Sequence, residues 1–385
     1  MAQARGVRVC LLGLENLAVL APEFRHHNIA GEGVQQTLLA RALARRGHDV
    51  RMVTWDLGQP EAREWDGIRV HKAYAPQAGI PLLRFFHPRW SGLWRALERA
   101  DADLYYTSCA GMHVGLLAMF CRRHGRRFVF RSASDADCDP ARLLVRYRRD
   151  RWLYEFGLRR AGAILVQTET QRQALARNYH LQGRVAGMLV ERAQPARARD
   201  IDILWVSNIR RVKRPDRVLD LASGLQQRHF HMVGGPLPGE EPLYREIEAA
   251  ARSRLNVAFQ GRLAYHATAA LYERARVSLN TSDVEGFPNS YLQAWMRGVP
   301  VVTRLDPDRV IEREGLGAVA RSSAGLETAL RRLLDDEHEW RAASERCQAY
   351  MAREHGEERV LGPYLEAFDT ALRRPPAAEY GTARA

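Results

Sequence analysis

Residues 285–302 read EGFPNSYLQAWMRGVPVV, and they follow the apolar run VSLNTS. Asn289 and Ser290 are residue types that cap helix N-termini, and Gly298 suits the left-handed position that ends a helix. Pro300 comes shortly afterwards, where the chain enters another apolar run. The stretch therefore predicts a strand, a loop containing glycine, a short helix and a second strand, which is the crossover unit of a parallel sheet.

The loop before this helix has the features of a phosphate-binding loop. A helix N-terminus presents unbonded N–H groups and the positive end of the helix dipole, so it attracts an anion. Gly286 keeps the backbone accessible, and Pro288 stiffens the loop. Glu285 projects from the loop and Gln293 lies on the helix, so the two can bind separate hydroxyl-bearing parts of one ligand. An ordinary crossover with polar surface residues fits the same pattern.

Apolar runs alternate with helical patterns along the whole chain, which predicts an α/β fold with parallel sheets covered on both faces. Strands are expected at Val7–Leu12, Val50–Thr54, Ile68–Val70, Leu104–Tyr106, Phe128–Arg131, Ile164–Val166, Ile203–Val206, Phe230–Val233, Val257–Phe259, Val277–Asn280 and Val299–Val302. Helices are expected at Gln35–Arg46, His113–His124, Leu143–Leu158, Arg217–Leu225, Leu243–Leu255, Ala267–Ala275, Ser290–Arg297, Glu337–Glu354 and Val360–Leu372.

The length of the chain predicts two domains, because 385 residues exceed what one hydrophobic core usually supports. The polar, proline-bearing run QPARAR at residues 194–199 is typical of a linker between them. Residues 375–385 read PPAAEYGTARA, and residues 374–385 are expected to form a disordered tail.

Composition excludes several classes of function. The formal net charge is +13, and nearly all of the positive charge is arginine, with only Lys72 and Lys213 as lysines. Such a charge is weak support for nucleic-acid binding, and no recognition motif accompanies it. The five cysteines are scattered without a CxxC pair, which argues against a zinc site and favours a reducing, cytoplasmic location. No apolar run reaches the roughly 18 residues that span a bilayer.

The opening stretch resembles the signature of retaining GT-B glycosyltransferases of family 4, the glycosyl transferases group 1. That signature has two glutamates eight positions apart and a helix ending in G-x-P-V-V, which Glu285 and GVPVV at residues 298–302 match. The resemblance implies that Glu285 contacts the hydroxyls of a donor sugar. It also implies that the sugar and phosphate are contacted by the loop of Gly286, Phe287, Pro288 and Asn289. The second glutamate, which would bind ribose, is replaced by Gln293, so weaker ribose binding or an altered nucleotide preference is expected.

A second motif follows the first expected strand of the second half, where residues 204–215 read LWVSNIRRVKRP. Basic side chains at the carboxyl end of a strand lie where ligands bind in doubly wound sheets, and they can stabilise a leaving diphosphate. The family has G-R-x-x-x-x-K-G here. Lys213 falls on the lysine, but Asn208 falls on the arginine, so Arg210 or Arg211 would have to take that role. A solvated basic turn is the alternative.

The resemblance continues more loosely in the first half of the chain. Gly31 and Gly33 form the family's glycine-rich loop, and RGHDV at residues 46–50 matches its turn into the second strand. That loop would lie against the donor phosphates or the acceptor. Gly234, in MVGGP of the second half, would pass close to the nucleotide.

Three acids, Asp135, Asp137 and Asp139, follow an expected strand end. They lack the glycine and the distal glutamate of a calcium loop, and a GT-B enzyme is not expected to need a donor metal. We interpret Asp137 as an acceptor-binding group or a polar partner near the reacting centre, and a capped polar loop as the alternative. No histidine occurs in this loop, and His113 is the nearest one upstream.

Residues 142–160, RLLVRYRRDRWLYEFGLRR, interleave basic and aromatic residues at helical spacing. Such a segment can lie on an anionic membrane surface. A partly buried helix with a solvated basic face fits the pattern as well.

The fold that the resemblance implies is GT-B, with two facing Rossmann-like domains and a cleft between them. Residues 1–195 would be the acceptor-side domain, 200–355 the nucleotide-sugar-binding domain, and 356–373 a C-terminal helix that crosses back to the first domain.

The implied reaction moves a sugar from a UDP- or GDP-sugar to a glycan or lipid-linked acceptor with retention of configuration and without a metal, in polysaccharide or glycolipid biosynthesis. Peripheral membrane association at the inner face is a further expectation, and nucleic acid is not an expected partner. A GT-B sugar-nucleotide epimerase and a non-catalytic nucleotide-sugar-binding protein remain alternatives.

Overall fold

The computed structural model describes residues 6–24, 27, 31–81, 83–191 and 198–373, and it divides into two compact units. The first unit comprises the described parts of residues 1–24, 29–187 and 357–385, and the second those of 25–28 and 188–356. Most of the expected linker, and the whole expected tail at 374–385, lie outside the described residues.

The first unit is built on an eight-stranded sheet in the order β3-β4-β2-β1-β5-β6-β7-β8. Its strands are β1 (Arg8–Leu12), β2 (Asp49–Thr54), β3 (Arg63–Trp65), β4 (Ile68–Lys72), β5 (Leu104–Ser108), β6 (Arg127–Arg131), β7 (Ala163–Val166) and β8 (Arg184–Val185). All neighbours are parallel except β3 and β4. The six parallel strands from β4 to β7 follow the doubly wound 3-2-1-4-5-6 order.

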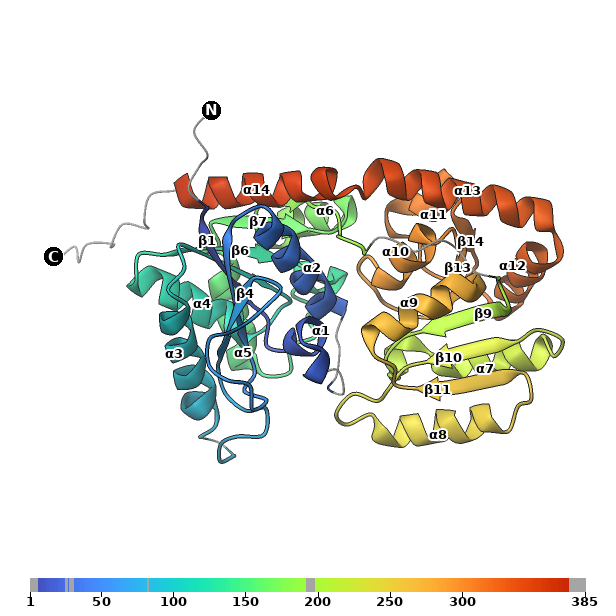
Figure 1. Ribbon diagram of the computed structural model, residues 1–385, viewed down its shortest axis with the longest axis horizontal. Helices are drawn as coiled ribbons and strands as arrows, with labels where there is room; N and C mark the ends of the chain where they lie inside the picture. Colours follow the sequence, from blue (N-terminus) through green and yellow to red (C-terminus); the bar gives the residue numbers. More distant parts are fainter. Residues whose placement is uncertain (1–5, 25–26, 28–30, 82, 192–197, 374–385) are drawn as a thin grey trace. The chain divides into compact units, whose positions relative to one another are not determined.

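Helices cover this sheet (Figure 1). They are α1 (Leu17–Leu20), α2 (Gly31–Arg45), α3 (Ser91–Ala100), α4 (Met112–Arg123), α5 (Arg148–Leu158), α6 (Glu169–Tyr179) and α14 (Glu357–Arg373). Although α14 is the last helix of the chain, it packs on strands β5 to β8 of this unit.

The second unit repeats the same architecture with a six-stranded parallel sheet in the order β11-β10-β9-β12-β13-β14, again 3-2-1-4-5-6. Its strands are β9 (Ile201–Val206), β10 (Phe230–Val233), β11 (Val257–Gly261), β12 (Ala275–Asn280), β13 (Val301–Thr303) and β14 (Gly317–Val319). Its helices are α7 (Pro215–Gly224), α8 (Glu241–Arg252), α9 (Tyr265–Arg274), α10 (Asn289–Met296), α11 (Val310–Glu314), α12 (Ser323–Asp335) and α13 (Glu337–Glu354). Among the described helices of both units, none has the length and apolarity to cross a membrane.

Every expected strand and helix has a counterpart, and two boundaries differ from the expected ones by four residues or more. Helix α2 begins at Gly31, so the expected glycine-rich loop is the first turn of the helix. Helix α5 begins at Arg148 and not at Leu143, because Tyr147 is extended and the Arg151 side chain hydrogen-bonds backbone carbonyls of the preceding loop.

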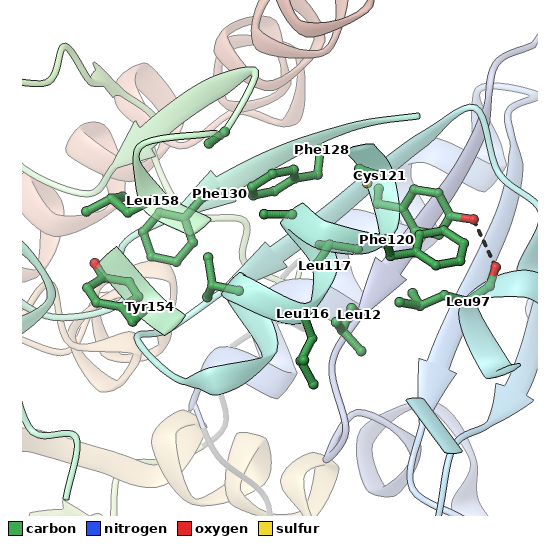
Figure 2. Close-up of a cluster of buried hydrophobic side chains, with 14 of the residues drawn as sticks. Leu12, Leu97, Leu116, Leu117, Phe120, Cys121, Phe128, Phe130, Tyr154 and Leu158 are labelled. Carbon is green, nitrogen blue, oxygen red and sulfur yellow. Dashed lines mark hydrogen bonds between the residues drawn. The ribbon is translucent and has the colours of Figure 1, made fainter. Parts of the chain in front are cut away.

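The core of the first unit is centred between its sheet and helices α4 and α5 (Figure 2). Two glycines bring these helices into backbone contact. A Cβ at Gly115 would lie 2.4 Å from the carbonyl oxygen of Leu153, and one at Gly157 would lie 2.5 Å from that of Val114. The position of α5 is therefore fixed by close helix packing.

Gly157→Ala is expected to lower the free energy of unfolding by about 1–3 kcal/mol, because the added methyl group meets backbone atoms that cannot move aside. Helix propensity, worth up to about 1 kcal/mol in favour of alanine, opposes only part of this loss. Gly362→Ala on α14 is the matched control. No heavy atom lies within 4 Å of its added Cβ, so it should raise the melting temperature. Thermal denaturation of both variants checks the prediction, and equal shifts would contradict it.

Candidate active site

The carboxyl ends of β9 and β12 lie side by side at the point where the strand order of the second sheet reverses. Doubly wound sheets bind ligands at this position, because the loops that leave the two strands diverge to opposite faces. The two loops here are residues 207–213 and 281–288. Each carries one of the two motifs singled out in the sequence.

Lys213 and Glu285, from the two loops, form an ion pair. The Lys213 Nζ donates to Glu285 Oε1 at 2.5 Å, and Ser282 Oγ donates to the same oxygen at 2.7 Å. Their side chains are 19% and 15% exposed. An ammonium and a carboxylate thus stand together at the switch point, within reach of solvent.

The turn that carries Lys213 is held by hydrogen bonds from the β12 loop. Thr281 Oγ1 donates to the Lys213 carbonyl at 2.8 Å and accepts from Trp205 Nε1 at 3.0 Å. The Asp283 amide donates to the Val212 carbonyl at 2.9 Å. These contacts fix the backbone of Lys213 relative to the Glu285 loop.

Arginines surround the pair, and they differ in what they contact. Arg214 and Arg217 form ion pairs with Asp283, at 3.5 and 2.6 Å. Arg210 and Arg211 form no side-chain hydrogen bond or ion pair with any residue that the structure describes. Both guanidinium groups therefore remain available to an anionic ligand beside Lys213.

Helix α10 begins directly after the Glu285 loop. Pro288 occupies the N-cap position without a side-chain cap, and Asn289 is the first helical residue, so neither Asn289 nor Ser290 caps the helix as expected. The positive end of the helix dipole is left without a side-chain acceptor at its cap. Gly298 ends the helix with φ +65°, as its sequence position predicted.

One residue expected to contact the donor, Phe287, makes other side-chain contacts in the structure. The Phe287 ring packs against Tyr291, Trp295 and His355, with centroid distances of 6.5, 6.1 and 6.3 Å. Its side chain thus anchors the loop, and a ligand contact of this residue would come from its backbone. The remaining loop residue, Gly286, lies between Glu285 and this anchor, half-buried.

Gln293 lies half-buried on α10. Its carbonyl accepts from Arg297 Nη1 at 3.2 Å, and its side-chain amide bonds none of the residues that the structure describes. Gly234 follows β10, where a Cβ would lie 1.8 Å from the Ser207 carbonyl oxygen. The close approach of two loops accounts for this glycine, and its contact with a nucleotide stays a prediction.

In the first unit, Asp137 lies in a single helical turn, Asp135–Cys138, just beyond β6. Its carboxylate accepts from the amides of Ala133 and Ser134 at 2.7 and 3.2 Å, in a capping box. Burial raises the pKa of Asp137 to about 6 against these donors. The carboxylate therefore holds the turn together, which is the geometry of a capped polar loop.

Asp137 makes stability depend on pH. Its folded-state pKa of about 6 lies above the unfolded value near 3.9, so its contribution is complete below about pH 4 and is lost as the pH rises through 6. Against Asp137→Asn, the wild type should lose up to about 3 kcal/mol of relative stability between pH 4 and 7. Denaturant titrations of both proteins across this range measure the difference, in which other buried carboxyls cancel. A constant difference would contradict the prediction.

Sequence reasoning missed a buried ion pair in the first unit. Arg131, at the end of β6, is fully buried and donates from Nη1 to both carboxylate oxygens of Glu32, at 3.2 and 3.1 Å. Burial raises the pKa of Glu32, while Arg131 opposes that change. Glu32 stands between Gly31 and Gly33 in the first turn of α2, so an acid flanked by two glycines was the available signal.

The nearest histidine upstream, His113, and the possible metal ligands were also considered as site residues from the sequence. His113 Nε2 contacts the Ser108 carbonyl at 3.0 Å, and burial lowers its pKa, which favours the neutral imidazole. Within the described ranges, no group of three or more His, Cys, Asp or Glu side chains is placed to hold a metal ion.

Comparisons with known proteins find solved structures that share this fold over nearly the whole chain. Sucrose-phosphate synthase from Thermosynechococcus elongatus matches with a TM-score of 0.75 and 17% identity, over 94% of this chain and 98% of that one. Anabaena HepE, solved with UDP and glucose, matches with a TM-score of 0.73 and 14% identity, over 94% and 99%. The catalytic domain of starch synthase IV from Arabidopsis thaliana, bound to ADP and acarbose, matches with a TM-score of 0.68 and 14% identity, over 96% and 100%. The sequence has no match among curated proteins.

Two Rossmann-like units of this strand order, together with these likenesses, define the GT-B fold. The sequence is specific about the family. Residues 30–188 match the glycosyl transferase 4-like domain, and residues 200–336 match the glycosyl transferases group 1 domain. The chain belongs to the glycosyl transferases group 1 family.

Proposed function

We propose that this chain transfers a sugar from a UDP- or GDP-sugar to a glycan or lipid-linked acceptor, with retention of configuration and without a donor metal. The observation that carries the proposal is the Lys213–Glu285 pair at the switch point of the second unit. Structures solved with UDP and glucose, and with ADP, have the same fold and support a nucleotide-linked donor. Polysaccharide or glycolipid biosynthesis in the cytoplasm is the setting that we infer for this reaction.

In the proposed reaction, Lys213 binds the diphosphate and Glu285 binds hydroxyls of the donor sugar. The bond between the anomeric carbon and the phosphate oxygen breaks, and the acceptor oxygen bonds that carbon on the same face. The acceptor proton passes to the leaving diphosphate. Lys213, with Arg210 or Arg211, stabilises the negative charge that develops on this group. Gln293 contacts the ribose, and Asp137 serves the acceptor side.

Because Lys213 and Glu285 contact each other in the structure, the donor would insert between their functional groups. A phosphate oxygen would replace the Glu285 carboxylate as the partner of the Lys213 ammonium. Sugar hydroxyls would replace the ammonium as the partners of the carboxylate. Each charge keeps a partner throughout, so binding does not leave a half-buried charge unpaired.

Nucleotide binding and turnover test the proposal separately. Thermal shifts with UDP, GDP and ADP, each with and without magnesium, should reveal one preferred nucleotide, because ligand at 100 times its Kd adds about 2.7 kcal/mol. The preferred sugar nucleotide should be hydrolysed slowly in water and consumed faster with an acceptor glycan. No shift with any nucleotide would overturn the donor site, and release of an altered free sugar would indicate an epimerase.

Gln293→Glu should tighten binding of the preferred nucleotide by about 5- to 20-fold, because a carboxylate accepts ribose hydroxyl hydrogen bonds more strongly than an amide. Isothermal titration calorimetry measures the change with two ligands, the nucleoside diphosphate and the sugar phosphate, which has no ribose. The ribose-free ligand should bind both proteins alike. Equal nucleotide affinity in the two proteins would contradict the ribose role.

A further inference from the structure

Exposed large apolar side chains of the described residues gather in two segments of the first unit, 79–91 and 142–160. Eight such side chains are exposed in all, and six lie in these segments: Ile80, Leu83, Phe86, Leu144, Tyr147 and Trp152. The other two, Val185 and Leu255, stand apart in sequence from these segments and from each other. Apolar exposure is therefore concentrated, which marks an interaction surface.

The two segments are joined by a contact between an arginine and an aromatic ring. The Arg149 guanidinium lies 3.5 Å from the ring centroid of Phe85. Phe85 is buried, and its ring lies 5.0 Å from that of exposed Phe86. Tyr147 and Trp152 flank Arg149 at the start of α5. We call these two segments together the basic–apolar face.

The exposed apolar groups stand on ordered structure. Leu144 is 76% exposed, and the Arg151 guanidinium bonds the carbonyls of both its neighbours, Leu143 and Val145, at 2.9 Å. Trp152 is 60% exposed and stacks on Phe156 with 5.3 Å between centroids. The close packing of α5 on α4 fixes this helix. Exposed apolar side chains that are fixed by such contacts are typical of a surface that another molecule covers.

Charge on the basic–apolar face has one sign. The two segments contain nine arginines and two acidic residues, which is +7 of the chain's +13 formal net charge. Asp150, one of the acids, already forms an ion pair with Arg149 at 2.8 Å. Arg84, Arg142 and Arg148 are exposed and form no side-chain ion pair or hydrogen bond within the described ranges.

We propose that the basic–apolar face docks on the surface of an anionic lipid bilayer. Leucine, phenylalanine and tryptophan side chains would enter the boundary between headgroups and acyl chains, and the arginines would contact lipid phosphates. Each basic residue near such a surface adds to the attraction, so insertion and charge act together. This inference goes beyond the proposed reaction and does not depend on it. It would bring the enzyme to acceptors that are anchored in lipid.

Flotation of the full chain with vesicles tests the proposal. With vesicles of phosphatidylcholine containing 30% phosphatidylglycerol, the protein should float with the lipid, and with pure phosphatidylcholine it should float at least about tenfold less. Leu144→Ser with Trp152→Ser should weaken binding to the anionic vesicles by about tenfold or more, since each change removes an inserting side chain. Arg146→Ser with Arg148→Ser should weaken it by a similar factor at low salt.

Matched changes on the second unit separate this surface from general charge and hydrophobicity. Leu255→Ser removes a fully exposed leucine, and Arg245→Ser with Arg321→Ser removes the same net charge as the arginine pair. These controls should float like the wild type, and circular dichroism verifies that all variants are folded. Absence of binding to anionic vesicles, or equal losses in face and control variants, would overturn the proposal. Flotation is independent of sugar transfer, so its failure would leave the proposed reaction standing.

Discussion

Lys213→Ala is expected to lower kcat for sugar transfer by about 10²–10³-fold. A preorganised donor to developing negative charge contributes about this much to a rate, and Lys213 is the lysine at the switch point of the second unit. The loss should appear mainly in kcat, because the charge on the leaving diphosphate grows as the sugar–phosphate bond breaks. Lys213→Arg should recover part of the rate, since it keeps the charge but moves it outward.

Lys72→Ala is the control for this variant, because Lys72 is the chain's other lysine and lies on β4 in the first unit. It should leave kcat unchanged. Arg210→Ala and Arg211→Ala then show which arginine acts beside Lys213, since both are without side-chain partners in the described structure. A Lys213→Ala enzyme with wild-type kcat would remove Lys213 from the reaction.

The pairing of Lys213 with Glu285 could be anticipated from the sequence. Each residue follows a predicted strand at its carboxyl end, and parallel strands deliver those ends to one edge of a sheet. The C-terminal glycine of α10 was equally predictable, because a left-handed position at a helix end favours Gly298 on local grounds alone. Features that depend on strand order or on local backbone geometry could therefore be predicted from the sequence.

Features that depend on distant packing were not predictable. The side chain of Phe287 anchors its loop on α10 and His355, and no sequence pattern reports that contact. Gly234 is required by the approach of Ser207 from another loop. Strand β14 escaped prediction because it has three residues and includes glycine, and helix α12 was overlooked although Ser322 caps it. The oxygens of Asp137 bond amides of the turn that carries it, as in the capped-loop alternative, and its role toward an acceptor stays a prediction.

Glu285→Ala is expected to lower sugar transfer by about 10²–10³-fold while leaving the nucleotide affinity intact. In the proposed site Glu285 contacts the donor sugar and not the nucleotide, so a nucleoside diphosphate lacks the group that this carboxylate binds. The variant also frees Lys213 from its 2.5 Å ion pair, which makes the ammonium available to phosphate without exchange. The thermal shift produced by the nucleoside diphosphate should therefore equal or exceed that of the wild type.

Glu285→Gln sharpens the same prediction, because it keeps the shape of the side chain and one acceptor oxygen but removes the charge. It should transfer sugar faster than Glu285→Ala and more slowly than the wild type, since hydrogen bonds to a charged acceptor exceed neutral ones by about 1 kcal/mol. Ser282, which donates to Glu285 Oε1 at 2.7 Å, can donate to the amide oxygen as well, so the loop keeps this contact. If Glu285→Ala lost nucleotide binding together with transfer, the carboxylate would act by holding the Lys213 turn in place, and its contact with the sugar would have to be abandoned.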